Sequence, residues 1–217
     1  MDHDNTLIPP HGGYRKLKSF QLAQLVYDIT VHFCNLHIDR RSRTHDQMVQ
    51  AARSGVQNIA EGSVASGTSK KTELKLTNVA RASLEELRLD FEDFLRQRGM
   101  RLWPPDHPTL ERFKTRRCAT MEEFLDWQKN EHGRTRTHTD EHGQRNKNGS
   151  GSLSVFAGAG LCRSDPEAEL AANGALSLLN LCCYLLDRQI ESQAAAFEKE
   201  GGFTERLYRV RTAKRGK

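Results

Sequence analysis

Apolar residues recur every three or four positions along four long stretches of the chain, and this spacing restricts the fold more than any other feature. The four stretches are residues 19–38, 44–61, 70–98 and 166–200. Such a repeat places apolar side chains on one face of an α-helix, whereas a half-buried β-strand alternates in steps of two. No segment alternates for long enough to predict a strand. The sequence therefore predicts an all-α protein, an antiparallel four-helix bundle.

Residues that start or stop helices agree with these boundaries. Ser69 is a suitable N-cap for the third helix, and Asp165 followed by Pro166 suits the start of the fourth. Gly99 and the Gly201–Gly202 pair follow the third and fourth helices, where glycine commonly ends a helix. The second and third helices are separated by residues 62–69, which are rich in Gly and Ser and predict a turn.

The remaining segments differ in composition, and they divide the chain into six parts. These are a flexible N-terminal lead (1–13), the first three helices (14–100), a connection with a short helix over about 109–128 (101–128), a disordered insertion (129–165), the fourth helix (166–200) and a basic C-terminal suffix (201–217). Disorder is predicted because Gly, Asn, Thr, Arg and His dominate residues 129–152, and a segment without apolar residues cannot bury a core.

Positive charge is local and not spread over the chain. The formal net charge is +5, and residues 203–217 hold six Lys and Arg residues against one Glu, so this suffix carries the whole excess. A suffix of this kind is either a solubilising, disordered end or the binding segment for an anionic partner. Three further basic clusters lie near predicted helix ends. The candidate nucleic-acid contacts are Arg15, Lys16, Lys18, Arg40, Arg41, Arg43, Lys70, Lys71, Lys75, Arg206, Arg209 and Arg211.

The antiparallel arrangement predicts which clusters can meet. The start of the first helix and the turn between the second and third helices lie at the same end of such a bundle, so the clusters at Arg15 and Lys70 are expected there. The cluster at Arg40 belongs to the opposite end and would join them only through oligomerisation.

No residue pattern predicts catalysis. Residues 62–69 have the glycine spacing of a phosphate-binding loop, but Thr68 stands where that loop requires Lys, and a predicted helix precedes it in place of a strand. We assign no catalytic residue, no metal ligand and no cofactor. The five cysteines are odd in number and irregularly spaced, which argues against a disulfide framework.

Polar residues next to the apolar stripes of the second and third helices predict a structural network. Asn58 and Glu61 share a face of the second helix, and Arg81 and Ser83 on the third helix are their candidate partners. We favour a network that fixes the register of these two helices over a ligand site.

One segment resembles a known family. Residues 52–62 (ARSGVQNIAEG) resemble the signature of a bacterial four-helix-bundle family, which includes 23S ribosomal RNA intervening-sequence proteins and accessory variability determinant proteins of diversity-generating retroelements. Residues 69–73, 78–87 and 14–21 continue the resemblance, which is dense over about 14–98 and weaker over 168–199. Typical members are shorter, and the long connection and the suffix are similar to a subgroup with a four-helix-bundle suffix domain.

The resemblance implies a non-enzymatic protein, a homopentameric ring of bundles with basic residues on a channel or face, which binds nucleic acid and a reverse transcriptase. The alternative from the residues is a structural or protein-interaction bundle with no direct role in nucleic-acid binding. The last helix is apolar beyond one face, which predicts either a homo-oligomer or cover from residues 109–128 and 153–161. The polar N-terminus and the absence of a long uninterrupted apolar run predict a cytoplasmic protein with no membrane partner.

Overall fold

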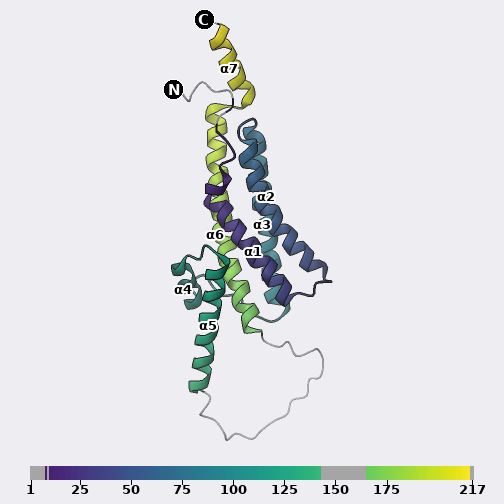
Figure 1. Cartoon of the computed structure of the whole chain (residues 1–217), viewed down its shortest axis with the longest axis vertical. Helices are drawn as coiled ribbons and strands as arrows, with labels where there is room; N and C mark the ends of the chain where they lie inside the picture. Colours follow the sequence, from purple (N-terminus) through teal and green to yellow (C-terminus); the bar gives the residue numbers. More distant parts are fainter. Residues whose placement is uncertain (1–7, 9, 143–164, 216–217) are drawn as a thin grey trace.

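The computed structural model describes residues 8, 10–142 and 165–215, with the side chains of 135–142 and 214 excepted. These residues form helices and no strand (Figure 1). The prediction of an antiparallel four-helix bundle is confirmed. The bundle consists of α1 (Lys18–His37), α2 (Arg43–Ala65), α3 (Lys70–Gln97) and α6 (Pro166–Glu200).

Two contacts at opposite ends of α1 show that it runs antiparallel to α6. At its start the Ser19 hydroxyl donates to Oε1 of Gln189 (2.8 Å), and at its end His37 Nδ1 lies 3.0 Å from the Asp165 carboxylate. Helix α1 packs on α2 and α6, and α3 packs on the same two helices from the other side. The four helices therefore close a ring around one core.

Large apolar side chains from each helix fill that core. Phe33 of α1 packs against Phe91 and Phe94 of α3, with ring centroids 5.0 and 4.7 Å apart. Leu84 of α3 and Leu179 of α6 are fully buried. Burial of each such side chain stabilises the fold by about 1.5–3 kcal/mol, so this interior accounts for most of the favourable free energy of folding.

The turn between α2 and α3 is shorter than predicted. We expected it to begin at Gly62, but α2 continues to Ala65 and only residues 66–69 remain outside the two helices. Gly62 is buried, and a Cβ there would lie 3.3 Å from the backbone oxygen of Glu73 and 3.4 Å from Cβ of Leu76. This glycine therefore allows α2 and α3 to approach closely and does not break the helix.

The connection between α3 and α6 contains two helices, α4 (Pro108–Arg116) and α5 (Met121–His142), where the sequence predicted one short helix. The prediction of disorder from residue 129 is wrong over residues 129–142, which continue α5. Composition misled here because charged residues can be good helix formers. Glu131 is also buried and accepts a hydrogen bond from Nε of Arg112 (2.8 Å). Residues 143–164 lie outside the described part of the chain.

The suffix is helical as well. Residues Phe203–Arg215 form α7, which extends past the end of the bundle (Figure 1). The interpretation of this suffix as a disordered end is therefore wrong for the residues that the structure describes. The lead is attached to the bundle near the same end, since the backbone N–H of Gly12 donates to the Ser63 carbonyl (3.0 Å).

Part of the apolar surface of α6 is covered by α4 and α5, as predicted for residues 109–128; residues 153–161, the other part of the predicted cover, lie outside the described residues. Both helices pack on α6, and Phe124 and Trp127 of α5 lie close enough to Gly174 that a Cβ there would be 2.8–3.0 Å from their rings. Leu181 and Tyr184 of α6 remain exposed. By length and composition, Pro166–Ala213 contains a segment apolar enough to cross a membrane, but 67% of that segment is buried inside the protein, which is typical of a core helix.

A buried amide anchors the chain that leaves α3. Asn173 Oδ1 accepts a hydrogen bond from the Trp103 backbone N–H (2.8 Å), and its Nδ2 donates to the Arg101 carbonyl (2.9 Å). We expect Asn173→Ala to lower the free energy of unfolding by about 2 kcal/mol, because the backbone N–H of Trp103 and the carbonyl of Arg101, both in part-buried hydrogen bonds, lose their buried partner. Urea unfolding measures this, and hydrogen exchange of the Trp103 amide should accelerate. Asn180→Ala, at an exposed position on the same helix, should change stability by less than about 0.5 kcal/mol.

Candidate nucleic-acid interface

A basic cleft of about 710 Å³ lies between α7, the end of α6 and the turn from α2 to α3. Its lining includes four cationic side chains and one carboxylate: Lys70, Lys199, Arg206, Arg209 and Glu200. Hydroxyl groups come from the turn, at Ser66, Thr68 and Ser69. The Ser66 and Thr68 hydroxyls already donate to the Ser63 and Ala65 carbonyls (2.8 and 3.4 Å), so the donors that the cleft offers an anion are its charged residues. Below we call it the tip cleft.

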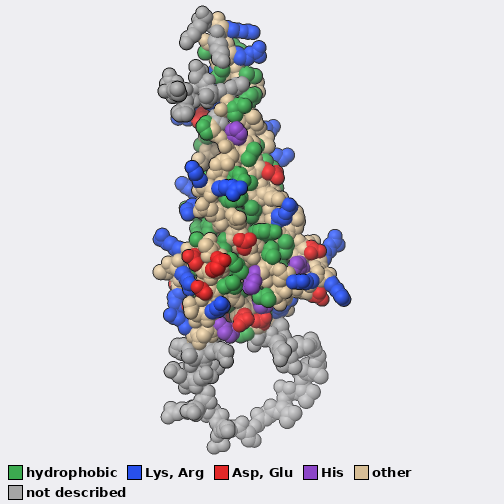
Figure 2. Space-filling model, viewed as in Figure 1, with side chains coloured by type: hydrophobic (Ala, Val, Ile, Leu, Met, Phe, Trp, Pro, Cys, Tyr) green, Lys and Arg blue, Asp and Glu red, His purple; other side chains and the backbone are tan. Residues whose placement is uncertain are grey.

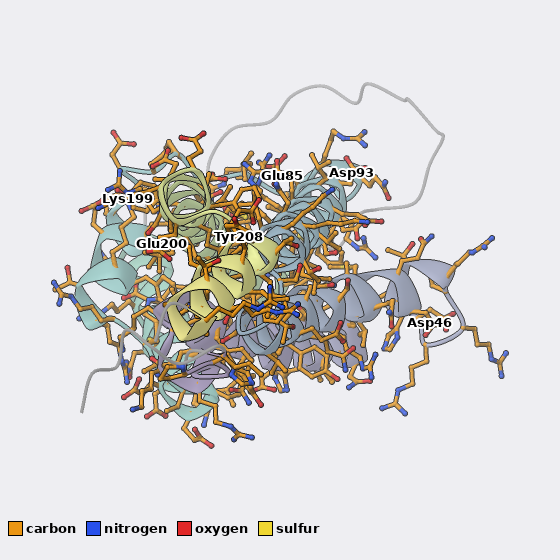
Figure 3. All side chains as sticks on the ribbon, turned by 90° about the horizontal axis from the view of Figure 1, so that it is seen from above. Asp46, Glu85, Asp93, Lys199, Glu200 and Tyr208 are labelled. Atoms are coloured by element: carbon orange, nitrogen blue, oxygen red, sulfur yellow. The ribbon has the colours of Figure 1, made fainter. Side chains whose placement is uncertain are left out.

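The glycine pair at the end of α6 sets the position of α7. Gly201 has a φ of 73°, a value that glycine adopts without strain, and its N–H donates to the Phe197 carbonyl (2.9 Å). The Gly202 N–H donates to the Glu205 carboxylate (2.9 Å), which caps the first turn of α7. Arg209 Nη2 donates to the Glu200 carbonyl (2.6 Å), so this guanidinium is fixed across the junction. From above, Lys199, Glu200 and Tyr208 are seen around this junction, and Asp46 lies far from it (Figure 3).

The opposite wall of the tip cleft is the first turn of α3. The Ser69 hydroxyl accepts a hydrogen bond from the Thr72 N–H (3.1 Å) and caps the helix. Lys70 Nζ lies 3.7 Å from the Glu73 carboxylate, which also accepts a hydrogen bond from Gln193 of α6 (3.2 Å). The positive end of the α3 dipole adds to the charge of Lys70 here.

The structure brings together only part of the predicted basic set. Lys70 meets Arg206 and Arg209 in the tip cleft, whereas Lys71 and Lys75 are exposed on α3 and do not line it. Arg211 is exposed on α7 and also lies outside the lining. The sequence predicted that the cluster at Lys70 would meet the cluster at Arg15 at this end, but in the tip cleft Lys70 lies with the suffix residues, and Arg15, Lys16 and Lys18 are not part of the lining.

The other two clusters lie farther away. Arg15 and Lys16 belong to the short helix η2 (Tyr14–Lys16), and Lys18 begins α1. Their neighbour Ser19 bonds Gln189, ten residues before Lys199 on α6, so the start of α1 lies about 15 Å along the bundle from the tip cleft. Arg40, Arg41 and Arg43 are exposed at the turn from α1 to α2, at the opposite end, as predicted. Figure 2 shows basic side chains both at the tip and on the flanks near the other end.

The predicted polar network is present in two separate parts. Asn58 Nδ2 donates to the Ser54 carbonyl (2.8 Å), and the Ser54 and Ser83 hydroxyls lie 2.9 Å apart across α2 and α3. Arg81 instead faces α6, where its Nε donates to the Asp187 carboxylate (2.9 Å), and this bond raises the pKa of Arg81. Glu61 is exposed and joins neither part.

The buried cysteines are poor nucleophiles. Burial raises the pKa of the Cys34 thiol to about 12 and that of Cys183 to about 11. It also raises the pKa of Cys182, whose thiol donates to the Ser19 carbonyl. Among the described residues, no group of three or more His, Cys, Asp or Glu is arranged to hold a metal ion.

A larger groove, of about 1360 Å³, runs between α1, α6 and the connection that carries α4. Leucines are the most frequent residues in its walls, including Leu22, Leu102, Leu181 and Leu185, and charged residues line it as well. Asp28 lies among them, and burial, with a smaller contribution from the nearby Glu122 charge, raises the pKa of its carboxyl group.

No family model, no curated protein and no solved structure matches this chain.

The sequence interpretation missed two residues: Lys199, which lines the tip cleft, and Asp187, which pairs with Arg81. Both stand on the long last helix, antiparallel to α3. The signal for Lys199 is its place two residues before Gly201, since the end of the last helix must lie beside the start of the third helix in this topology.

Proposed function

We propose that this chain is a non-enzymatic nucleic-acid-binding accessory protein, a homo-oligomeric helical bundle that binds the RNA or DNA backbone. The observation that supports it best is the tip cleft, whose lining includes four basic residues from three segments and one acidic residue. Phosphate contacts of this kind supply affinity without reading sequence. From the resemblance of residues 52–62 to the bacterial four-helix-bundle family, we also propose that a reverse transcriptase is a partner and that the oligomer is a pentameric ring.

Salt dependence tests the proposal. If four cations in the tip cleft each release one counterion, the affinity for single-stranded RNA should fall about 50-fold between about 50 and 200 mM salt. Filter binding of the full chain to a mixed-sequence RNA measures this slope. A second RNA of equal length and different sequence should bind within about threefold, since the contacts are to the backbone. No binding at low salt, or an affinity that does not change with salt, would contradict the proposal.

The apolar groove favours a second candidate function, in which the bundle binds a partner protein. Exposed leucines at Leu102 and Leu181 are typical of a protein contact surface. Removal of residues 203–217 separates the two candidates. If the full chain does not bind nucleic acid and the shortened chain still binds its partner protein, the protein-interaction function is supported.

A further inference from the structure

Helix α7 presents two different faces. Phe203, Arg206, Arg209, Val210 and Ala213 line the tip cleft. The spacing of Tyr208, Arg211 and Arg215 is three and then four residues, so these three side chains share another face, and all three are exposed. Arg209 lines the tip cleft, is exposed, and follows Tyr208 directly along the helix, so it lies between the tip cleft and this outer face.

Tyr208 is the most exposed of the large apolar side chains in the described part of the chain, at 72%. Within that part, its ring has no aromatic partner, and its hydroxyl makes no hydrogen bond. Folding of the bundle therefore does not explain the ring. A single exposed aromatic residue is ordinary on a protein surface. This one differs because two guanidinium groups share its face and the basic tip cleft adjoins it.

An aromatic ring between cations is the arrangement with which proteins hold single-stranded nucleic acid. The cations contact phosphates, and the ring stacks on a base, which any base can accept because each has a flat face. A duplex keeps its bases stacked on one another, so an exposed ring on a helix has no free base to contact. The same cations attract single strands and duplexes alike, but the ring distinguishes them.

We infer that α7 binds a single strand in preference to a duplex, with a base stacked on Tyr208 and the adjacent phosphates at Arg211 and Arg215. Arg209 then leads the strand from this face into the tip cleft. The inference rests on the proposed function, because it specifies which form of nucleic acid the tip binds.

The test compares one oligonucleotide in two forms. A fluorescein-labelled, mixed-sequence RNA of about 16 nucleotides is titrated with the full chain, alone and annealed to its complement, and anisotropy is recorded. The wild-type chain should bind the single strand about tenfold more tightly than the duplex. Tyr208→Ser should weaken binding to the single strand about tenfold, the loss of one stacked base, and leave binding to the duplex unchanged.

Two variants control for the loss of the ring. Tyr208→Phe keeps a stacking surface and should bind within about twofold of the wild type. Tyr184→Ser removes an exposed tyrosine of α6, 59% exposed, and should not change affinity. Arg211→Gln should lower the salt slope by about one, whereas Tyr208→Ser should leave the slope as it is. Circular dichroism confirms that each variant retains its helices.

The outcomes separate the inference from the proposed function. If the chain binds neither form at low salt, both are wrong. If it binds nucleic acid but binds the duplex as tightly as the single strand, or if Tyr208→Ser weakens both forms equally, only the inference is wrong. A loss in Tyr208→Phe as large as in Tyr208→Ser would also overturn it, since stacking does not need the hydroxyl.

Discussion

Replacing Gly55 with valine is expected to lower the free energy of unfolding by about 3 kcal/mol, the cost of overpacking a close helix contact. A Cβ at this position would lie 2.6 Å from Cδ2 and 2.7 Å from Cγ of Leu84, which is fully buried. Cγ sits near the root of the leucine side chain and cannot move away without disturbing the core. Helices α2 and α3 must therefore separate, and the Ser54–Ser83 hydrogen bond beside this contact stretches with them.

Urea unfolding followed by circular dichroism measures the effect as a midpoint lowered by about 1–2 M. Gly133→Val is the matched control, because Gly133 also lies within a helix and a Cβ there meets no atom within 4 Å. The control should change stability by less than about 0.5 kcal/mol, since glycine and valine differ little in helix propensity. Equal midpoints for the two variants would show that α2 and α3 do not pack as closely at Gly55 as the structure places them.

The close contact at Gly55 illustrates what the sequence could predict of the fold. Apolar spacing identified all four helices of the bundle. A helix with apolar side chains on one face is stable only when that face is buried against other helices, so the pattern indicates both the helix and its packing. Spacing could not assign a role to Gly55 or Gly62. A glycine in a helical sequence is consistent both with the end of the helix and with a site where a neighbouring helix packs closely. Only the position of the neighbouring helix decides between these.

The connection to α6 was harder to predict for a different reason. The polar half of α5 lacks an apolar stripe, so its sequence resembles a disordered segment. This helix is stabilised by contacts with distant residues, such as the ion pair of Arg112 with Glu131, nineteen positions apart. A local sequence pattern cannot predict such a pair.

The sequence predicted that the candidate site would be basic, but it predicted only some of the residues that meet there. Basic residues at helix ends were apparent, and the antiparallel topology placed Lys70 at the same end as the start of the first helix, but the suffix was not assigned to that end. The direction in which α7 leaves α6 was not predictable, because Gly201 permits several. That direction decides that Arg206 and Arg209 face Lys70 while Arg211 faces outward.

Charge reversal in the tip cleft is expected to have the largest effect on binding. The double variant Arg206→Glu with Arg209→Glu replaces the two arginines that we propose contact phosphate by two negative charges that would repel it. It should weaken binding to single-stranded RNA at about 100 mM salt by about 100-fold or more, because like charges held against a phosphate cost several kcal/mol and each 1.4 kcal/mol is tenfold. The hydrogen bond from Arg209 to Glu200 is also lost, but it is exposed and contributes little to stability.

The matched control carries the same change of net charge at the opposite end of the bundle, as Arg40→Glu with Arg41→Glu. Both of these arginines are exposed, and the hydrogen bond in which Arg41 takes part uses its backbone N–H, so the substitution leaves it intact. The control should bind within about threefold of the wild type, because charges farther away than the Debye length, about 10 Å at this salt, are screened. A loss as large in the control as in the tip variant would mean that net charge alone drives binding, and the tip cleft would then not be the site. A tip variant with unchanged affinity would exclude Arg206 and Arg209 from the interface.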